Sequence, residues 1–207
     1  MKHPSATLLQ RHATGDLPQP VWIAVDAHIE TCGQCAAVAT AAEELEGRRL
    51  AEIAPVDLSP GVLDRLMASL AAPTVLPVPA ARRLGDVDLP RAVVEAKVKA
   101  RRWLAPGFWI AHVDASDDGD WRAFMLRTPA GAAIPAHRHH GPEMIAVISG
   151  ALTDGQRYEA GDFAEIDKDD EHALRADPGQ PCVCLIAVQG RFRWQGAARL
   201  LSPILGV

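Results

Sequence analysis

The stretch Gly131-Ala-Ala-Ile-Pro-Ala-His137-Arg-His139-His-Gly-Pro-Glu143-Met-Ile-Ala-Val-Ile-Ser-Gly150 decides the fold of the C-terminal half of the chain. His137 and His139 are two residues apart, so on a β-strand both side chains lie on the same face. Glu143 follows a Gly-Pro turn and enters the next strand, where it can face the same point. We therefore expect these three residues to bind one metal ion.

A second stretch, Gly161-x5-Asp167-x-Asp169-x2-His172, supplies a further histidine. The two stretches resemble the paired motifs of the cupin family, although Asp167 and Asp169 stand where the second motif usually has proline and glycine. The resemblance implies an antiparallel β-barrel in which His172 completes a site of three histidines and one glutamate. Such a site keeps a coordination position open, so its residues suit iron for dioxygen chemistry or zinc with a bound hydroxide. Strand alternation points the adjacent His140 away from the ion.

The rest of the C-terminal half has the sequence pattern of an antiparallel β-protein. Short apolar runs alternate with glycine, aspartate and proline, which is typical of strands in a barrel or sandwich. The predicted strands are residues 108–113, 121–127, 143–148, 162–166 and 182–188. Cys182 and Cys184 share one face of the last of these strands, where they either pack in the core or have a redox role near the metal.

The N-terminal half predicts about four helices, over residues 5–15, 20–30, 35–50 and from Pro60 onward. Ser5 can cap the first helix, and Gly15 lies at its C-terminal end, where a residue in the left-handed backbone conformation commonly ends a helix. The fourth helix carries leucine or methionine at the spacings of one helix face. That apolar stripe either packs on the first three helices or forms a surface for a partner.

A thiolate and imidazole cluster is predicted in the helical half from His28-x3-Cys32-x2-Cys35. On a helical path these side chains converge on one point, and thiolates with histidine suit a closed, tetrahedral, structural zinc site. Four ligands are required, and His3 is the candidate for the fourth, with His12 as the competing donor. Zinc would stabilise a helical bundle that has only a small core.

The two halves are separated by a segment rich in proline and alanine. Prolines between residues 73 and 90 remove backbone donors, so this segment cannot sustain a helix or a central strand. We therefore predict an α + β protein with two compact units, each with its own core. These are a zinc-bound helical bundle over residues 1–72, a linker over 73–90, and an antiparallel β-barrel of cupin type over 91–207.

Charge and cysteine content restrict the class of protein. The net charge is −5, and residues 1–90, with 7 basic and 11 acidic side chains, contribute −4 of it, which argues against direct binding of nucleic acid. No apolar run approaches the roughly 20 residues that span a bilayer, so no membrane segment is expected. The four cysteines form two close pairs, which favours a reducing compartment over a disulfide framework. We expect a cytoplasmic protein.

The residues of the N-terminal half carry a second resemblance. His3, the Ala13-Thr-Gly-Asp-Leu-Pro18 stretch and the His28-x3-Cys32-x2-Cys35 spacing are similar to the domain with which zinc-binding anti-sigma factors hold their partners. With the linker and cupin, the whole chain resembles the ChrR-type anti-sigma factors. That family implies a regulator rather than an enzyme. It binds an extracytoplasmic-function sigma factor through its N-terminal domain and releases it on a singlet-oxygen-like signal that requires the cupin. Zinc is implied in both sites.

An alternative function remains on the residues alone. The chain could be a cupin metalloenzyme, such as a small-molecule dioxygenase, with the helical zinc domain as an appendage for oligomerisation. Metal content separates the two hypotheses. Zinc in each domain without oxygen consumption favours the regulator, whereas iron in the barrel with turnover favours the enzyme.

Overall fold

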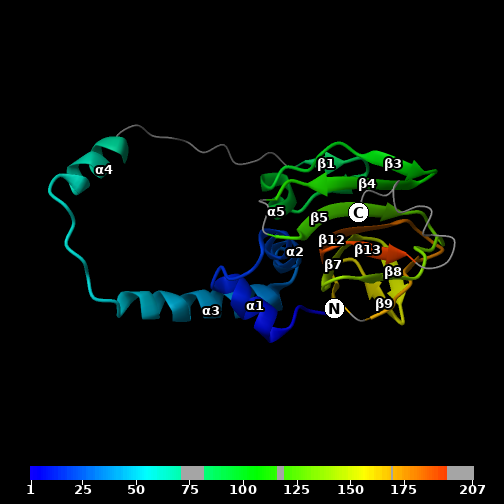
Figure 1. Cartoon of the computed structure of the whole chain (residues 1–207), viewed down its shortest axis with the longest axis horizontal. Helices are drawn as coiled ribbons and strands as arrows, with labels where there is room; N and C mark the ends of the chain where they lie inside the picture. Colours follow the sequence, from blue (N-terminus) through cyan, green and yellow to red (C-terminus); the bar gives the residue numbers. More distant parts are fainter. Residues whose placement is uncertain (71–81, 116–118, 169, 195–207) are drawn as a thin grey trace.

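The computed structural model describes residues 1–70, 82–115, 119–168 and 170–194. Helices come first and a β-rich region follows, as expected (Figure 1). The four predicted helices are present at nearly the expected bounds, and a short fifth one precedes the strands. They are α1 (Ala6–Ala13), α2 (Gln19–Ile29), α3 (Gly33–Ala51), α4 (Val62–Leu70) and α5 (Arg91–Glu95). Among the described helices, none combines the length and the apolar character that crossing a bilayer requires.

Local capping explains where the first three helices begin. The Ser5 hydroxyl accepts a hydrogen bond of 3.2 Å from the backbone N–H of Leu8 at the start of α1. Pro20 lies in the first turn of α2, where its missing N–H has no cost. At the start of α3 the Cys32 sulfur accepts from the N–H of Cys35 at 3.5 Å, so a predicted metal ligand is also a helix cap.

The strands form an antiparallel six-stranded sheet and several smaller ones. The large sheet has the order β10-β7-β12-β5-β4-β3, a three-stranded sheet has the order β11-β8-β9, and β13 pairs with β6. Among the described residues these sheets do not join into one closed barrel, which is where the fold departs from the predicted barrel. The strands concerned are β3 (Arg102–Ala105), β4 (Phe108–Val113), β5 (Trp121–Thr128), β6 (His137–His139), β7 (Glu143–Ser149), β8 (Ala151–Asp154), β9 (Gln156–Glu159), β10 (Phe163–Ile166), β11 (Arg175–Ala176), β12 (Cys182–Gln189) and β13 (Phe192–Trp194).

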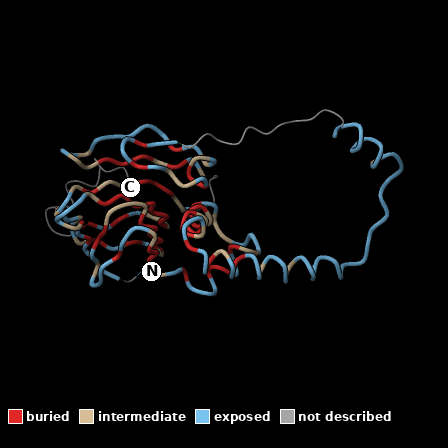
Figure 2. Tube along the Cα trace, turned by 180° about the vertical axis from the view of Figure 1, so that it is seen from behind, coloured by how far each residue is buried: buried red, intermediate tan, exposed pale blue. Residues whose placement is uncertain are grey.

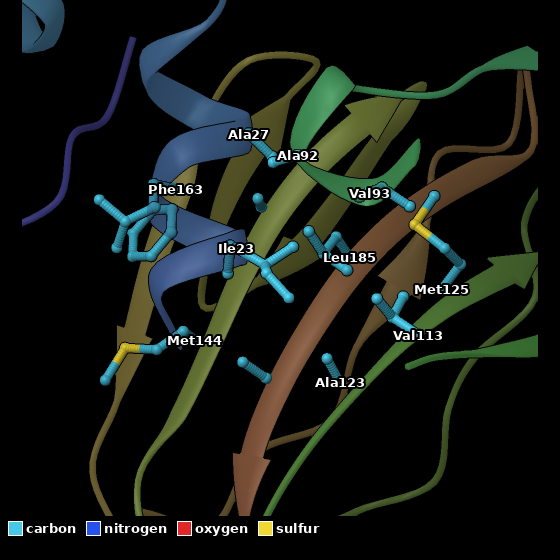
Figure 3. Close-up of a cluster of buried hydrophobic side chains, with 14 of the residues drawn as sticks. Ile23, Ala27, Ala92, Val93, Val113, Ala123, Met125, Met144, Phe163 and Leu185 are labelled. Carbon is cyan, nitrogen blue, oxygen red and sulfur yellow. The ribbon is translucent and has the colours of Figure 1, made fainter. Parts of the chain in front are cut away.

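Helix α2 packs directly on the outer face of the large sheet. Leu185 of β12 faces α2, where Ile23 lies against it, and Ala27 lies against Ala92 of α5 (Figure 3). The alternate residues of β12, such as Ile186, point the other way into a separate hydrophobic cluster inside the sheets, the inner hydrophobic cluster. Both faces of β12 are therefore buried, as its continuous apolar sequence requires.

The helical region and the sheets thus share one hydrophobic cluster. It runs from Leu8 and Leu9 of α1 through α2 to β12. Separate cores for the two regions, which the proline-rich segment led us to expect, are not what the structure shows. The reason is α2 itself, which is apolar nearly all round and so needs partners on more than one side.

The predicted linker is partly structured. Residues 73–81 of it lie outside the described residues, but the hairpin β1 (Arg83–Leu84) and β2 (Val87–Asp88) follows, with one buried side chain from each strand. Helix α5 then begins against α2. Its first N–H groups, from Arg91 and Ala92, both donate to the Glu30 carboxylate at 2.8 Å. The domain bounds 1–72, 73–90 and 91–207 remain a prediction.

The C-terminal part of α3 and all of α4 expose apolar side chains. Figure 1 shows α4 set apart from the other elements, and Figure 2 shows the same segments as exposed. Within the described part of the chain, α4 buries no residue, and Leu70 is 72% exposed. Of the two expectations for the α4 stripe, packing on the first three helices is not what the structure shows.

Candidate metal centres

The N-terminal cluster brings together the four residues predicted from the sequence. Ligand atoms of His3, His28, Cys32 and Cys35 all lie within 4.8 Å of one another. His28 Nε2 is 3.3 Å from the Cys35 sulfur, and His3 Nδ1 is 3.4 Å from the Cys32 sulfur and 3.3 Å from that of Cys35. A tetrahedral zinc with its usual bond lengths places neighbouring sulfur and nitrogen donors roughly 3.5 Å apart. The donor set and its spacing therefore fit such an ion.

Burial sets the protonation of the N-terminal cluster. Burial lowers the pKa of His28, which keeps its imidazole neutral and able to bind a metal. Burial and the neighbouring Cys32 raise the pKa of Cys35 to about 11. A buried thiolate pair is therefore costly unless a cation neutralises it, and a divalent ion would do so.

The competing donor His12 lies elsewhere. Its Nε2 is 3.3 Å from the Asp26 carboxylate, and its ring stacks on Trp22 with 5.0 Å between centroids. The structure thus places His3 in the cluster and His12 outside it.

The N-terminal segment that carries His3 is held by the edge strand β10. The N–H of Lys2 donates to the Asp162 carboxylate at 2.8 Å, and the N–H of Phe163 donates to the carbonyl of Lys2 at 3.1 Å. The Phe163 ring also meets the His28 imidazole edge to face, with 5.8 Å between centroids. Two ligand candidates therefore rest on the sheet region. We call Asp162 and Phe163 the latch.

The second cluster lies inside the sheets and contains the other four predicted residues. Ligand atoms of His137, His139, Glu143 and His172 lie within 4.8 Å of one another. Strand β6 supplies two histidines, and Glu143 begins β7. His172 is brought to them by a backbone bridge to His137, with hydrogen bonds of 3.1 and 3.2 Å. Nε2 of His139 and Nε2 of His172 are each 3.4 Å from one Glu143 oxygen.

Further contacts orient these ligand candidates. Nδ1 of His172 is 2.8 Å from the Asp154 carboxylate, and Nδ1 of His137 is 2.8 Å from the Pro135 carbonyl. Each of these bonds leaves Nε2 directed toward the cluster. Sequence reasoning missed Asp154, because nothing in local spacing shows that it lies beside a histidine eighteen residues away.

The second cluster also fits a cation on electrostatic grounds. Burial lowers the pKa of His137 to about 4 and that of His139 to about 3, so both imidazoles are neutral and free to bind a metal. Burial raises the pKa of Glu143 to about 7. For His172 burial opposes protonation, but Asp154 and Glu143 outweigh it and raise its pKa. One Glu143 oxygen, Oε2, has no hydrogen-bond partner within the described ranges, and a bound cation would satisfy it.

Other singled-out residues fall outside the two clusters. His140 is exposed and its Nε2 accepts from Arg193 at 2.9 Å, so it points away from the second cluster, as predicted. Cys182 and Cys184 are free, buried and 3.6 Å apart, in the inner hydrophobic cluster. Their packing role fits this position, and a redox role stays a prediction. Asp169 lies outside the described residues.

The fold and the two clusters define a class: a helical region with a thiolate and imidazole cluster, joined to a cupin-like region with an imidazole and carboxylate cluster. Residues 90–191 match the family of ChrR cupin-like domains. Anti-sigma-E factor ChrR of Cereibacter sphaeroides is 32% identical over 208 residues, which is 99% of this chain and 98% of that protein. The chain therefore belongs to the ChrR family of anti-sigma factors.

A solved structure agrees with this family. The crystal structure of Rhodobacter sphaeroides SigE in complex with the anti-sigma ChrR contains a chain that is 34% identical, with a TM-score of 0.75 over 91% of this chain and 99% of that one. A putative acetylacetone dioxygenase from Methylibium petroleiphilum PM1 is 15% identical, with a TM-score of 0.42 over 48% of this chain and 76% of that one. That second likeness is too distant to bear on function.

Proposed function

We propose that this chain inhibits an extracytoplasmic-function sigma factor by binding it through the N-terminal helices. An oxidative signal of the singlet-oxygen type then releases the sigma factor, and this release requires the cupin. The support is membership of the ChrR family together with the solved complex of ChrR with SigE. The proposed site of action is the cytoplasm, without catalysis and without direct contact to nucleic acid or membrane.

The observation that carries this proposal is the unpartnered apolar surface of α3 and α4. A chain of this size rarely leaves so many large apolar side chains in water unless a partner covers them. We propose that the sigma factor covers this surface. The exposed side chains that form it are Val38, Leu45, Leu50, Leu63, Leu66, Met67 and Leu70.

We further propose zinc as the metal of both clusters. In the first, His3, His28, Cys32 and Cys35 would hold it as a closed structural ion that ties the N-terminal segment to α2 and α3. In the second, His137, His139, Glu143 and His172 would hold it with one position open. The metal supplies a fixed positive charge and a coordination position there, while Asp154 and Pro135 keep the imidazoles in the required tautomer.

The latch offers a route by which the cupin controls the helices. Strand β10 pairs with β7, so that Ile166 lies opposite Glu143 and Phe163 lies opposite Ala146. One end of this strand pair therefore holds a ligand candidate of the second cluster, and the other end holds the segment with His3. A change at Glu143 that displaces β7 would loosen the latch, and sigma binding would favour one of the two resulting states.

In vitro transcription tests the release step. The full chain, loaded with zinc, should suppress transcription by its sigma factor, and photosensitised singlet oxygen should restore transcription. Glu143→Gln keeps the size of the side chain but removes its charge, so this variant should still inhibit and should respond poorly to singlet oxygen. Equal restoration in both proteins would contradict the proposed role of the second cluster.

The alternative of a dioxygenase with a helical zinc appendage rests on one feature, the buried cluster that could hold iron with an open position. Oxygen consumption by the iron-loaded chain with small phenols or diketones would favour it. Zinc in the purified protein without oxygen uptake would favour the regulator.

A further inference from the structure

A cavity of about 330 Å³ lies inside the sheets and reaches the second cluster. Its wall is almost wholly apolar, with side chains such as Phe108, Phe124 and Ile186. Among the described lining residues, His137 and Glu143 carry the ionisable side chains, and both belong to the cluster. Trp194, whose ring centroid lies 5.0 Å from that of His137, adds an indole N–H at the same end. The cavity thus has an apolar body and one polar end. Its size is within the range of small-molecule sites, which begins at roughly 300 Å³.

The geometry points to a medium-chain monocarboxylate as the occupant: a linear, apolar tail in the cavity, with its carboxylate at the His137 and Glu143 end. The inference deepens the proposed function and rests on it in one respect, that the second cluster is metal-loaded. Each step follows from the charge, the lining and the size of the cavity.

The open coordination position selects the head group. With a divalent ion bound, Glu143 and the Asp154 carboxylate that contacts His172 balance its charge, and the four ligand candidates leave one coordination position for an oxygen ligand. One carboxylate fills that position, whereas a phosphate or a dicarboxylate would bring further negative charge into an apolar space. No Lys or Arg is among the described residues that line the cavity, so a second anionic group would find no cationic partner among them.

The lining and the volume select the tail. Sugars and other polyols need several hydrogen-bonding groups, and the apolar wall does not provide them. A water molecule occupies about 30 Å³ in the liquid, so the cavity has room for roughly eleven groups of that size. Octanoate has about ten non-hydrogen atoms, so its volume is close to that of the cavity.

Titration calorimetry of the full, zinc-loaded chain with a series of carboxylates tests the inference. Each added methylene should tighten binding about fourfold, the factor that burial of one CH₂ gives, from butanoate to octanoate. Dodecanoate exceeds the cavity and should bind no more tightly than octanoate. Affinity that keeps rising through dodecanoate, or the absence of saturable binding, would overturn the assignment.

Two rim variants and a matched control locate the binding. Ala105 and Ala133 line the cavity and are exposed, whereas Ala100 is exposed and lies outside the lining. Ala105→Trp and Ala133→Trp should each weaken octanoate binding at least tenfold, and Ala100→Trp should leave it unchanged. Equal effects of rim and control variants would overturn the location.

Removing the metal tests the head group. Octanoate should lose most of its affinity when the second cluster is stripped of zinc, whereas 1-octanol, which has no charge, should lose little. If octanoate and 1-octanol lose affinity by the same factor, the assignment of a carboxylate head group is overturned. Sigma-factor binding is measured on the same preparations, so a chain that binds sigma but no carboxylate refutes this inference alone.

Discussion

Phe163→Ala tests whether the latch joins the two regions. Phe163 is 2% exposed on β10, its ring contacts the His28 imidazole, and its N–H donates to the Lys2 carbonyl. Truncation leaves that backbone hydrogen bond in place and removes the ring from the shared cluster. The expected change is therefore a cavity between α2 and the sheet, next to the N-terminal cluster of ligand candidates.

The magnitude follows from the burial of the ring. Truncation of a buried phenylalanine to alanine costs about 3–5 kcal/mol in free energy of unfolding. In a chain of roughly 150–250 residues each kcal/mol lowers the midpoint of thermal unfolding by about 2–4 °C, so a fall of roughly 6–20 °C is expected. Circular dichroism measures this fall. Hydrogen exchange measures the accompanying loss of protection in residues 1–35.

Phe124→Ala is the matched control. Phe124 is also 2% exposed, but it lies in the inner cluster, away from the helices. It should lose comparable stability while residues 1–35 keep their protection at temperatures well below unfolding. If both variants expose residues 1–35 equally, or if Phe163→Ala leaves residues 1–35 protected, the latch does not join the helical region to the sheets and the reasoning is wrong.

Three further predictions follow from single contacts. Asp154→Asn weakens its bond to His172 and should reduce metal affinity of the second cluster about 10–100-fold in chelator competition, and unchanged affinity would contradict the orienting role. Leu66→Glu on α4, at a position 53% exposed, should alter the free energy of unfolding by under about 0.5 kcal/mol yet weaken sigma-factor binding about tenfold or more. Calorimetry showing full affinity would exclude α4 from the interface. Gly150 and Gly155 both have positive φ, but a Cβ at Gly150 would overlap a backbone carbonyl, so Gly150→Ala should cost about 1–3 kcal/mol more than Gly155→Ala in urea unfolding.

Features that depend on the spacing of nearby residues were predictable from the sequence. His137 and His139 share a strand face because side chains alternate with a period of two, and Ser5 caps α1 because its hydroxyl reaches the N–H three residues on. The same logic gave the bounds of the four predicted helices and the five predicted strands to within a few residues, but it did not give α5 or the shorter strands. It also gave His28, Cys32 and Cys35 as neighbours, whereas His172 came from the resemblance to the cupin motifs and His3 from the need for a fourth ligand.

Features that depend on long-range packing were not predictable. Lys2 and Asp162 are 160 residues apart, and no periodicity relates them. The choice between His3 and His12 depended on how the N-terminal segment runs along β10. One signal was available, since α2 is apolar on nearly every face, and such a helix needs partners on more than one side.

The most direct test of the central claim is the mass of the complex in solution. The full, zinc-loaded chain is co-expressed with an extracytoplasmic-function sigma factor of the same genome, and the purified material is analysed by size exclusion with light scattering. We expect a one-to-one complex that is lost when Cys32→Ser and Cys35→Ser remove the thiolates of the N-terminal cluster. A wild-type chain that retains both zinc ions and elutes without the sigma factor would contradict the claim.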